Sequence, residues 1–189
     1  MFTLEQGKKL IELARHAIET YFEHKTLALE LYKEFSEKQG VFVTLKLKGK
    51  LKGCIGFTEP TMELYKAVVR AARAAAFEDT RFKPLKKEEF NEIEIEISIL
   101  TKPELIRVLR PEEYFKKIVV GRDGLIIKAG VYSGLLLPQV PVEYNWDVEK
   151  YLMQLCMKAG VPMDAWRNYP IHKFQAQIFA EENGKVVMK

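Results

Sequence analysis

The segment EIEIEISIL at residues 92–100 constrains the fold more than any other part of the chain. Isoleucine occupies every second position from Ile93 to Ile99, and glutamate fills most of the positions between them. Successive side chains of a β-strand point to opposite faces of the sheet. The alternation therefore predicts a half-buried antiparallel strand with one apolar face and one polar face.

Three helices are predicted before this strand. Thr3 and Gln6 form a capping box that begins a helix reaching about residue 23. A second helical stretch is expected through Leu27 and Phe35 and ends at Gly40. A third, apolar over most of its circumference, is expected over 61–77 with Thr61 as its cap.

Hairpins supply most of the remaining structure. VFVTLKL (41–47) and LKGCIGF (51–57) are expected to pair around the turn 48–50. Further hairpins are expected at GRDG (121–124), between IVV and LIIKA, at Ser133-Gly134 and at Asn183-Gly184. No regular βαβ alternation is present, so the fold class is α+β, with mainly antiparallel sheets and hairpins packed by helices.

Two prolines mark the clearest break along the chain. Pro103 and Pro111 bracket a boundary near 101–111, with a short helix predicted at 111–117. We expect residues 1–189 to form one domain that this boundary divides into two sublobes.

Composition narrows the class of protein. The chain has 189 residues, a net charge of +4, two cysteines and a lysine–glutamate balance typical of thermophiles. It has no apolar run long enough for a membrane span and no secretory signal, which predicts a cytoplasmic protein without a structural disulfide. No CxxC, HExxH, P-loop or GxGxxG pattern is present, so neither a metal site nor a cofactor is expected.

The stretch KGCIG around Cys54 is the first candidate site. With a three-residue loop at 48–50, Leu47 would face Leu51, Lys46 would face Lys52, and Thr44 would face Cys54. That register gathers the aliphatic residues on one face and places the cysteine on the other, polar face. Lys52 would favour the thiolate, and Gly53 and Gly56 would leave room near the thiol. The alternative is that the cysteine packs as a small apolar residue and the lysines are merely solvated.

Two further stretches carry candidate residues. The helix over 61–77 runs into FEDTRFKP, where acidic residues oppose the helix dipole, so Asp79 and Arg81 are expected to have specific partners. In LLLPQVPVEYNWD (135–147), two prolines stiffen the chain around Gln139, with Glu143 and Trp146 following, a composition typical of a binding-pocket wall.

Together these stretches resemble one family. LKGCIG is similar to the hallmark six-residue motif of the AMMECR domain family, with Lys52 in place of the usual arginine, and AFEDTRFKPL, EIEISIL, GLLLPQVPVEYNWD and CMKAGVPMDAW resemble its other signatures in the same order. The resemblance covers about residues 7–180. It implies an α+β fold of two sublobes with the motif near the cleft between them. It also implies Memo-type and radical-SAM proteins as partners in a modification pathway, but it supplies no activity.

Three kinds of function follow from these residues. In an enzyme, Cys54 would be the nucleophile, Lys52 and Arg81 would supply positive field, and Glu143 or Asp79 would act as acid or base. In a binding module, the lysine hairpin would recognise an anionic small molecule, a nucleic acid or a protein. In an interaction subunit, the chain would serve a larger assembly. The expected ligand-binding cleft comprises Lys52, Gly53, Cys54, Gly56, Asp79, Arg81, Gln139, Glu143 and Trp146.

Overall fold

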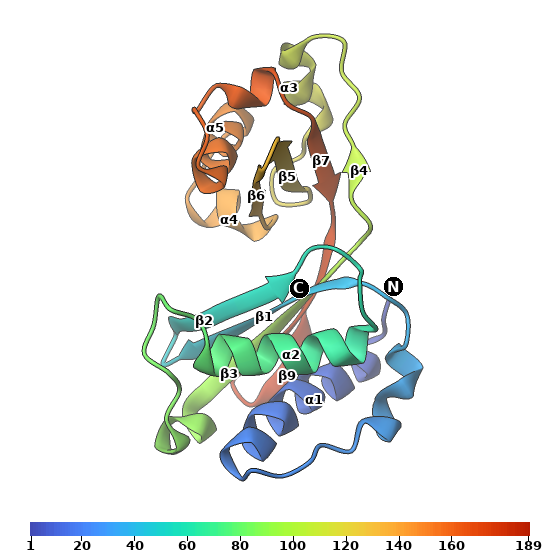
Figure 1. Ribbon diagram of the computed structural model, residues 1–189, viewed down its shortest axis with the longest axis vertical. Coiled ribbons are helices and arrows are strands. Elements are labelled where there is room, and N and C mark those ends of the chain that lie inside the picture. Colours follow the sequence, from blue (N-terminus) through green and yellow to red (C-terminus); the bar gives the residue numbers. More distant parts are fainter. The chain divides into compact units, whose positions relative to one another are not determined.

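The computed structural model describes residues 1–189, which divide into two compact units. Unit 1 comprises Met1–Leu100 and Gln177–Lys189, and unit 2 comprises Thr101–Ala176. Helices and antiparallel strands are present in both, which confirms the α+β class (Figure 1). No helix is long and apolar enough to cross a membrane.

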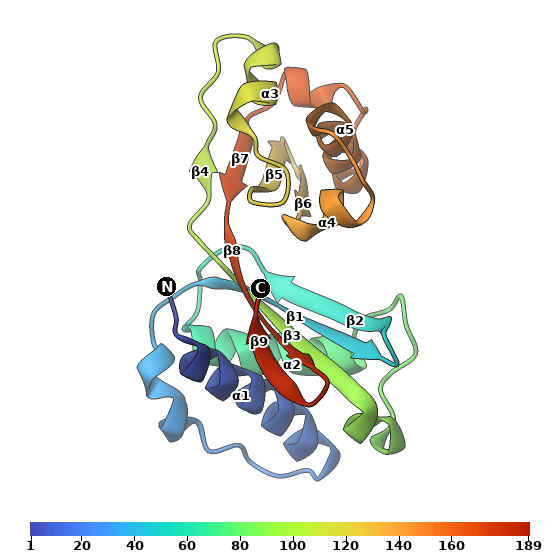
Figure 2. The ribbon, with the colours of Figure 1, turned by 180° about the vertical axis from the view of Figure 1, so that it is seen from behind.

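Unit 1 is a five-stranded sheet with two helices on one face. The strand order is β2-β1-β3-β8-β9. Helix α2 lies in front of β1 and β2 in Figure 1 and behind them in Figure 2, and α1 packs against α2, β3 and β9. The elements are α1 (Leu4–Phe22), η1 (Leu29–Phe35), β1 (Gly40–Leu47), β2 (Lys50–Phe57), α2 (Leu64–Phe77), η2 (Lys87–Glu92), β3 (Ile93–Leu100), β8 (Ala176–Glu182) and β9 (Lys185–Met188).

The alternating strand forms the centre of this sheet. The isoleucines of β3 are at most 3% exposed and pack with Val41, Val43 and Leu45 of β1 beneath the two helices. The opposite face carries the glutamates of β3 together with Thr44 and Cys54. The sequence therefore predicted both the strand and its two faces.

Unit 2 has its own sheet and its own core. The strand order is β4-β7-β5-β6, and α5 packs against β5 and β6 around Tyr151, Leu152 and Trp166. The elements are β4 (Glu104–Leu105), η3 (Pro111–Glu113), α3 (Tyr114–Lys117), β5 (Gly124–Ala129), β6 (Tyr132–Leu136), α4 (Gln139–Glu143), α5 (Val148–Ala159), η4 (Ala165–Arg167) and β7 (Ile171–Phe174).

Several predicted boundaries were wrong for local reasons. The stretch after α1 is a 3-10 helix that ends at Phe35, and Gly40 begins β1 instead of ending a helix. Helix α2 begins after Glu63, and no side chain caps it. Residues 118–120 form no strand, since the Asp123 side chain and backbone close a turn onto Val119. The next hairpin turns at residues 130–131, with Gly130 at φ 64°, and not at Ser133-Gly134.

Candidate functional site

The hairpin that carries Cys54 turns more tightly than predicted. Leu47 pairs with Lys50 across a two-residue turn in which Lys48 and Gly49 have φ of 52° and 74°, the type I′ geometry that suits twisted strands. Lys46 then pairs with Leu51 and Leu45 with Gly53, which leaves Lys52 as the extra residue of a β-bulge. The predicted pairs Leu47–Leu51 and Lys46–Lys52 were therefore wrong. Beyond the bulge, the predicted pair Thr44–Cys54 is confirmed.

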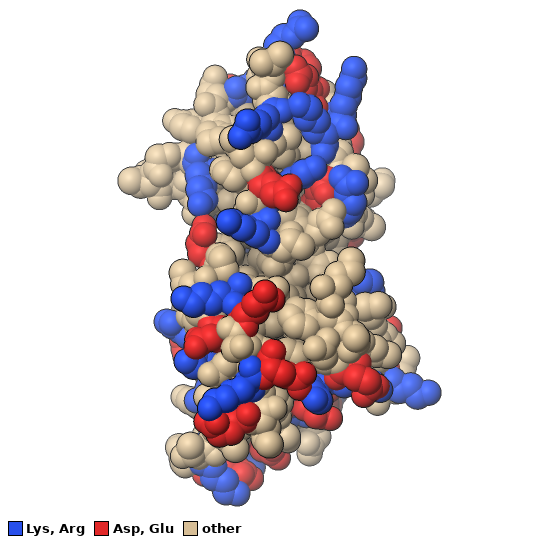
Figure 3. Space-filling view, turned by 90° about the vertical axis from the view of Figure 1, so that its right-hand side faces the viewer, with Lys and Arg blue, Asp and Glu red and all other residues tan.

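The bulge gives Lys52 a structural partner. Its Nζ lies 2.9 Å from Glu89 Oε2 in η2, and this lysine side chain is only 14% exposed. Two more hairpin lysines are paired in the same way, Lys46 with Glu96 and Lys48 with Glu92. Glutamates therefore neutralise most of the predicted lysine surface. On the face shown in Figure 3, basic and acidic side chains are likewise interspersed instead of forming one continuous basic stripe.

The two glycines beside Cys54 permit close packing. A Cβ at Gly53 would lie 2.0 Å from the carbonyl oxygen of Ala75, so β2 and α2 meet backbone to backbone there. A Cβ at Gly56 would lie 2.3 Å from the Val41 carbonyl oxygen and 2.4 Å from the Phe42 ring. Both positions therefore need glycine for contacts within unit 1. The space that the sequence suggested near the thiol is filled by the helix backbone and by the Phe42 ring.

Asp79 and Arg81 are each other's partners, and together they hold the backbone of Cys54. Arg81 donates from Nε to Asp79 Oδ1 at 2.9 Å and from Nη2 to Oδ2 at 2.7 Å. The Cys54 N–H donates to Asp79 Oδ2 at 2.9 Å, and Arg81 Nη2 donates to the Cys54 carbonyl oxygen at 2.9 Å. Because β2 is an edge strand, these bonds occupy backbone groups that no further strand pairs. We call this arrangement the Asp79–Arg81 clamp.

The clamp is electrostatically strong. Asp79 is 7% exposed, and its hydrogen bonds from Arg81, joined by those from the Cys54 and Arg81 N–H groups, lower the pKa of its carboxyl to about 2 despite burial. Asp79 is therefore an ionised anchor at neutral pH. The expected role of Asp79 as a proton-transferring acid or base has no support in this geometry.

The Cys54 thiol lies half-buried on the sheet face opposite the helices. Burial raises the pKa of the thiol, and the hydrogen bond from Thr44 and the charge of Arg81 oppose this shift without overcoming it. Thr44 Oγ1 donates to Sγ at 3.1 Å. The expectation that Lys52 would favour the thiolate was wrong, because Lys52 is paired with Glu89.

The remaining candidate residues belong to unit 2. Gln139 begins and Glu143 ends the short helix α4, and Glu143 is exposed. Trp146 is half-buried and stacks on Tyr144 with ring centroids 5.1 Å apart. The Oε1 atom of Gln139 is buried without a hydrogen-bond donor. The cleft that would join these residues to Cys54 stays a prediction.

Sequence reasoning missed two residues near the thiol. Thr44 was placed opposite Cys54, but its role as donor to Sγ was not foreseen. Glu96 was assigned only to a polar face, whereas the β1–β3 register places it directly opposite Thr44, and it is 8% exposed. The roles of Thr44 and Glu96 could be found only from the register of three strands. That register depends on pairing between residues about 50 positions apart in the sequence. No group of three or more His, Cys, Asp and Glu side chains is arranged to hold a metal ion.

The fold and the site define an α+β protein of two units whose signature hairpin carries a clamped cysteine. The AMMECR1 family model matches residues 11–179, so the chain belongs to the AMMECR1 family.

The relatives match over nearly their whole length. Protein MJ0810 of Methanocaldococcus jannaschii is 51% identical over 196 residues, covering 100% of this chain and 98% of that protein. Protein TK0174 of Thermococcus kodakarensis is 48% identical, with coverage of 94% and 91%. The crystal structure of uncharacterized protein PH0010 from Pyrococcus horikoshii is similar with a TM-score of 0.92 at 47% identity, covering 98% of this chain and 97% of that one.

Proposed function

We propose that unit 1 carries a ligand-binding site centred on the Cys54 thiol. This proposal rests on the contacts that the residues of the LKGCIG motif make. Lys52 pairs with Glu89, Gly53 and Gly56 permit close packing, Ile55 packs against the core, and the backbone of Cys54 is held by the clamp. The Cys54 side chain is the one reactive group of the motif that these contacts do not use, and its only hydrogen bond is the one it accepts from Thr44.

Binding is favoured over nucleophilic catalysis at neutral pH. A nucleophilic cysteine needs a populated thiolate, usually from a nearby base or a strong positive field. Here burial raises the pKa of the Cys54 thiol, and the nearest arginine is already neutralised by Asp79. A protonated thiol next to the Thr44 hydroxyl offers a weak donor and a polarisable contact to a ligand.

A cysteine-dependent reaction is the second candidate, and one observation favours it. The Thr44 hydroxyl donates to Sγ, an orientation that stabilises a thiolate once it forms. The charge of Arg81 acts in the same direction. Covalent chemistry at Cys54 would then rise steeply with pH above neutrality.

The test is the alkylation rate of Cys54 against pH in a Cys156→Ala background, with iodoacetamide as the neutral probe. The binding proposal expects measurable reaction in the folded protein with an apparent pKa above the ordinary value of about 8.5. An apparent pKa below that value would favour the enzyme. The absence of any reaction before unfolding would overturn both candidates, because the thiol would then be inaccessible.

The family resemblance also supports a place in a modification pathway with Memo-type and radical-SAM proteins. Co-purification of the full chain with each of these proteins tests it, with an Arg81→Ala variant to show whether the clamp contributes. Failure to co-purify with either would count against the pathway but not against the thiol site.

A further inference from the structure

Three polar side chains form a row across three strands of unit 1. Thr44 in β1 is paired with Cys54 of β2 on one side and with Glu96 of β3 on the other. Directly opposed residues project to the same face of a sheet, so thiol, hydroxyl and carboxylate lie on the face opposite the helices. Adjacent strands are about 4.8 Å apart, which places Glu96 about 10 Å from Cys54 across the row.

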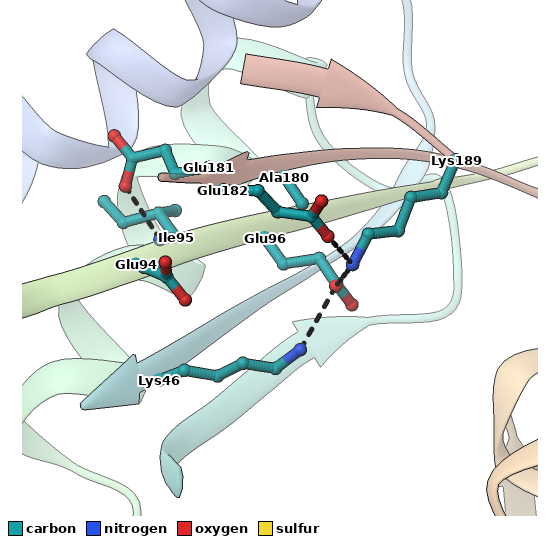
Figure 4. Close-up of a pocket in the computed structure, with 8 residues that line it drawn as sticks. All are labelled: Lys46, Glu94, Ile95, Glu96, Ala180, Glu181, Glu182 and Lys189. Carbon is teal, nitrogen blue, oxygen red and sulfur yellow. Dashed lines mark hydrogen bonds and ion pairs between the residues drawn. The ribbon is translucent and has the colours of Figure 1, made fainter. Parts of the chain in front are cut away.

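Two lysines compensate the charge of Glu96. Lys189 Nζ lies 3.2 Å from Glu96 Oε2 and 2.9 Å from Glu182 Oε1, and Lys46 Nζ lies 3.5 Å from the same Glu96 oxygen (Figure 4). Glu96 is 8% exposed, so solvent screens its charge poorly. Glu94 lines the same hollow and has no ion-pair partner there.

The groups around the thiol therefore act in opposite directions. Burial opposes the thiolate most strongly and the charges of Asp79 and Glu96 add to it, whereas the Thr44 hydroxyl and Arg81 favour the thiolate. Arg81 and Asp79 neutralise each other within the clamp. The effect of Glu96 on ionisation of the thiol then depends on how completely Lys46 and Lys189 neutralise its charge.

We propose that the Lys46–Glu96–Lys189 cluster controls the reactivity of the Cys54 thiol, with Lys189 as the adjustable member. Lys189 follows the last strand and is 39% exposed, so its ammonium group can leave Glu96 without disturbing a strand. This inference concerns the regulation of the thiol site and rests on the proposed function.

The test is a mutant cycle on the full chain carrying Cys156→Ala. Lys189→Met should slow alkylation of Cys54 by iodoacetamide at pH 8 about threefold, and Glu96→Gln should speed it about threefold. In the Glu96→Gln background, Lys189→Met should have a smaller effect, because Glu96 no longer holds the lysine ammonium beside the row. Lys185→Met is the matched control, since Lys185 in β9 is exposed and forms no ion pair with Glu96.

The apparent pKa of the thiol is measured in the same variants from the ultraviolet absorbance of the thiolate, with the titration of a Cys54→Ser protein subtracted to remove the tyrosine signal. This readout does not require a probe to reach the thiol, so it separates the two proposals. If the thiol pKa values shift in the expected order but iodoacetamide does not alkylate Cys54, the thiol site is refuted and the control by Glu96 stands. Equal pKa values in the wild type, Lys189→Met and Glu96→Gln, or an undiminished effect of Lys189→Met when Glu96 is absent, would overturn the inference.

Discussion

Each unit contains a buried aspartate held by a neighbouring arginine, but the two pairs connect different things. In unit 1 Asp79 binds Arg81 and reaches the backbone of Cys54, 25 residues away. In unit 2 Asp123 binds Arg122 through Nε and Nη2, both at 2.8 Å, and accepts the N–H of Val119 only four residues away. The same chemistry thus joins distant segments in one unit and closes a turn in the other.

The difference is also visible in the ionisation of the two carboxylates. The pKa of Asp79 is lowered to about 2. Asp123 is fully buried, and burial opposes its ionisation, so the hydrogen bonds of Arg122 and Val119 lower its pKa only after offsetting that cost. For Asp79 the hydrogen bonds of Arg81 are the largest influence on the pKa, whereas for Asp123 the largest influence is burial.

The largest expected effect is that of Asp79→Ala. It leaves the Cys54 N–H and Arg81 without their acceptor, and we expect unit 1 to lose about 4 kcal/mol. Asp123→Ala should cost unit 2 about 2 kcal/mol, because its partners are local and its desolvation cost disappears with it. Both tryptophans, Trp146 and Trp166, lie in unit 2, so fluorescence reports that unit and hydrogen exchange in β2 reports the other. Equal losses of stability in the two units would contradict the expected difference between Asp79 and Asp123.

The strand glycines extend the comparison to packing. Gly53→Ala would place a Cβ 2.0 Å from the Ala75 carbonyl, whereas Gly134→Ala would place one 2.8 Å from backbone atoms of Leu155 and Ala159. We expect losses of about 3 and about 1 kcal/mol, since overpacking costs rise with the required displacement. Urea unfolding of each variant measures this, with Gly184→Ala as a strained-turn control at φ 74° where no atom is near. A Gly53→Ala protein as stable as the wild type would mean that β2 moves freely from α2.

Acid should weaken unit 1 through Asp79. A carboxyl whose pKa is lowered from 3.8 to about 2 stabilises the folded state above pH 4, and this contribution is lost as the pH falls from about 4 to 2. The loss should amount to about 2 kcal/mol. Asp79→Asn should be less stable at pH 6 and should show a shallower acid dependence in hydrogen exchange of β2. An unchanged acid profile in Asp79→Asn would assign the dependence to other carboxyls.

The smallest expected effect concerns the geometry of the arginines. Lysine keeps the charge but cannot donate to both carboxylate oxygens and to a carbonyl at once. Arg81→Lys should therefore cost about 1 kcal/mol, a small loss because half of the arginine side chain is exposed and solvent weakens the pair. Arg122→Lys should cost less, because Arg81 also loses its bond to the Cys54 carbonyl oxygen. Comparison of the two variants by hydrogen exchange would show whether the bond to the Cys54 carbonyl contributes. A larger loss of stability for Arg122→Lys than for Arg81→Lys would contradict this prediction.

The sequence predicted those features that depend on local periodicity. The strand at 93–100, the cap at Thr3 and the final hairpin at Asn183-Gly184 are all confirmed. Each is set by residues within a few positions of one another, so a single segment contains the necessary information.

What the sequence did not predict depends on distant partners or on a single extra residue. The bulge at Lys52 changed the pairing of the hairpin. It was not foreseen, because the same lysines and glycine suit a type I′ turn as well as a three-residue loop. The need for a partner of Asp79 was foreseen from its position after a helix, but not that this partner was the next arginine along the chain. The roles of Thr44 and Glu96 follow only from the pairing of β1 with two other strands.

Unit 2 is inserted between two neighbouring strands of unit 1. Strand β3 ends at Leu100, β8 begins at Ala176, and the two are adjacent in the sheet. Both ends of the described chain belong to unit 1 (Figure 2). Tension applied between residues 1 and 189 would therefore load unit 1 directly and could not stretch unit 2 until β3 and β8 had separated. In a single-molecule pulling experiment, unit 2 should extend only after unit 1 has ruptured, as a mechanically shielded insert.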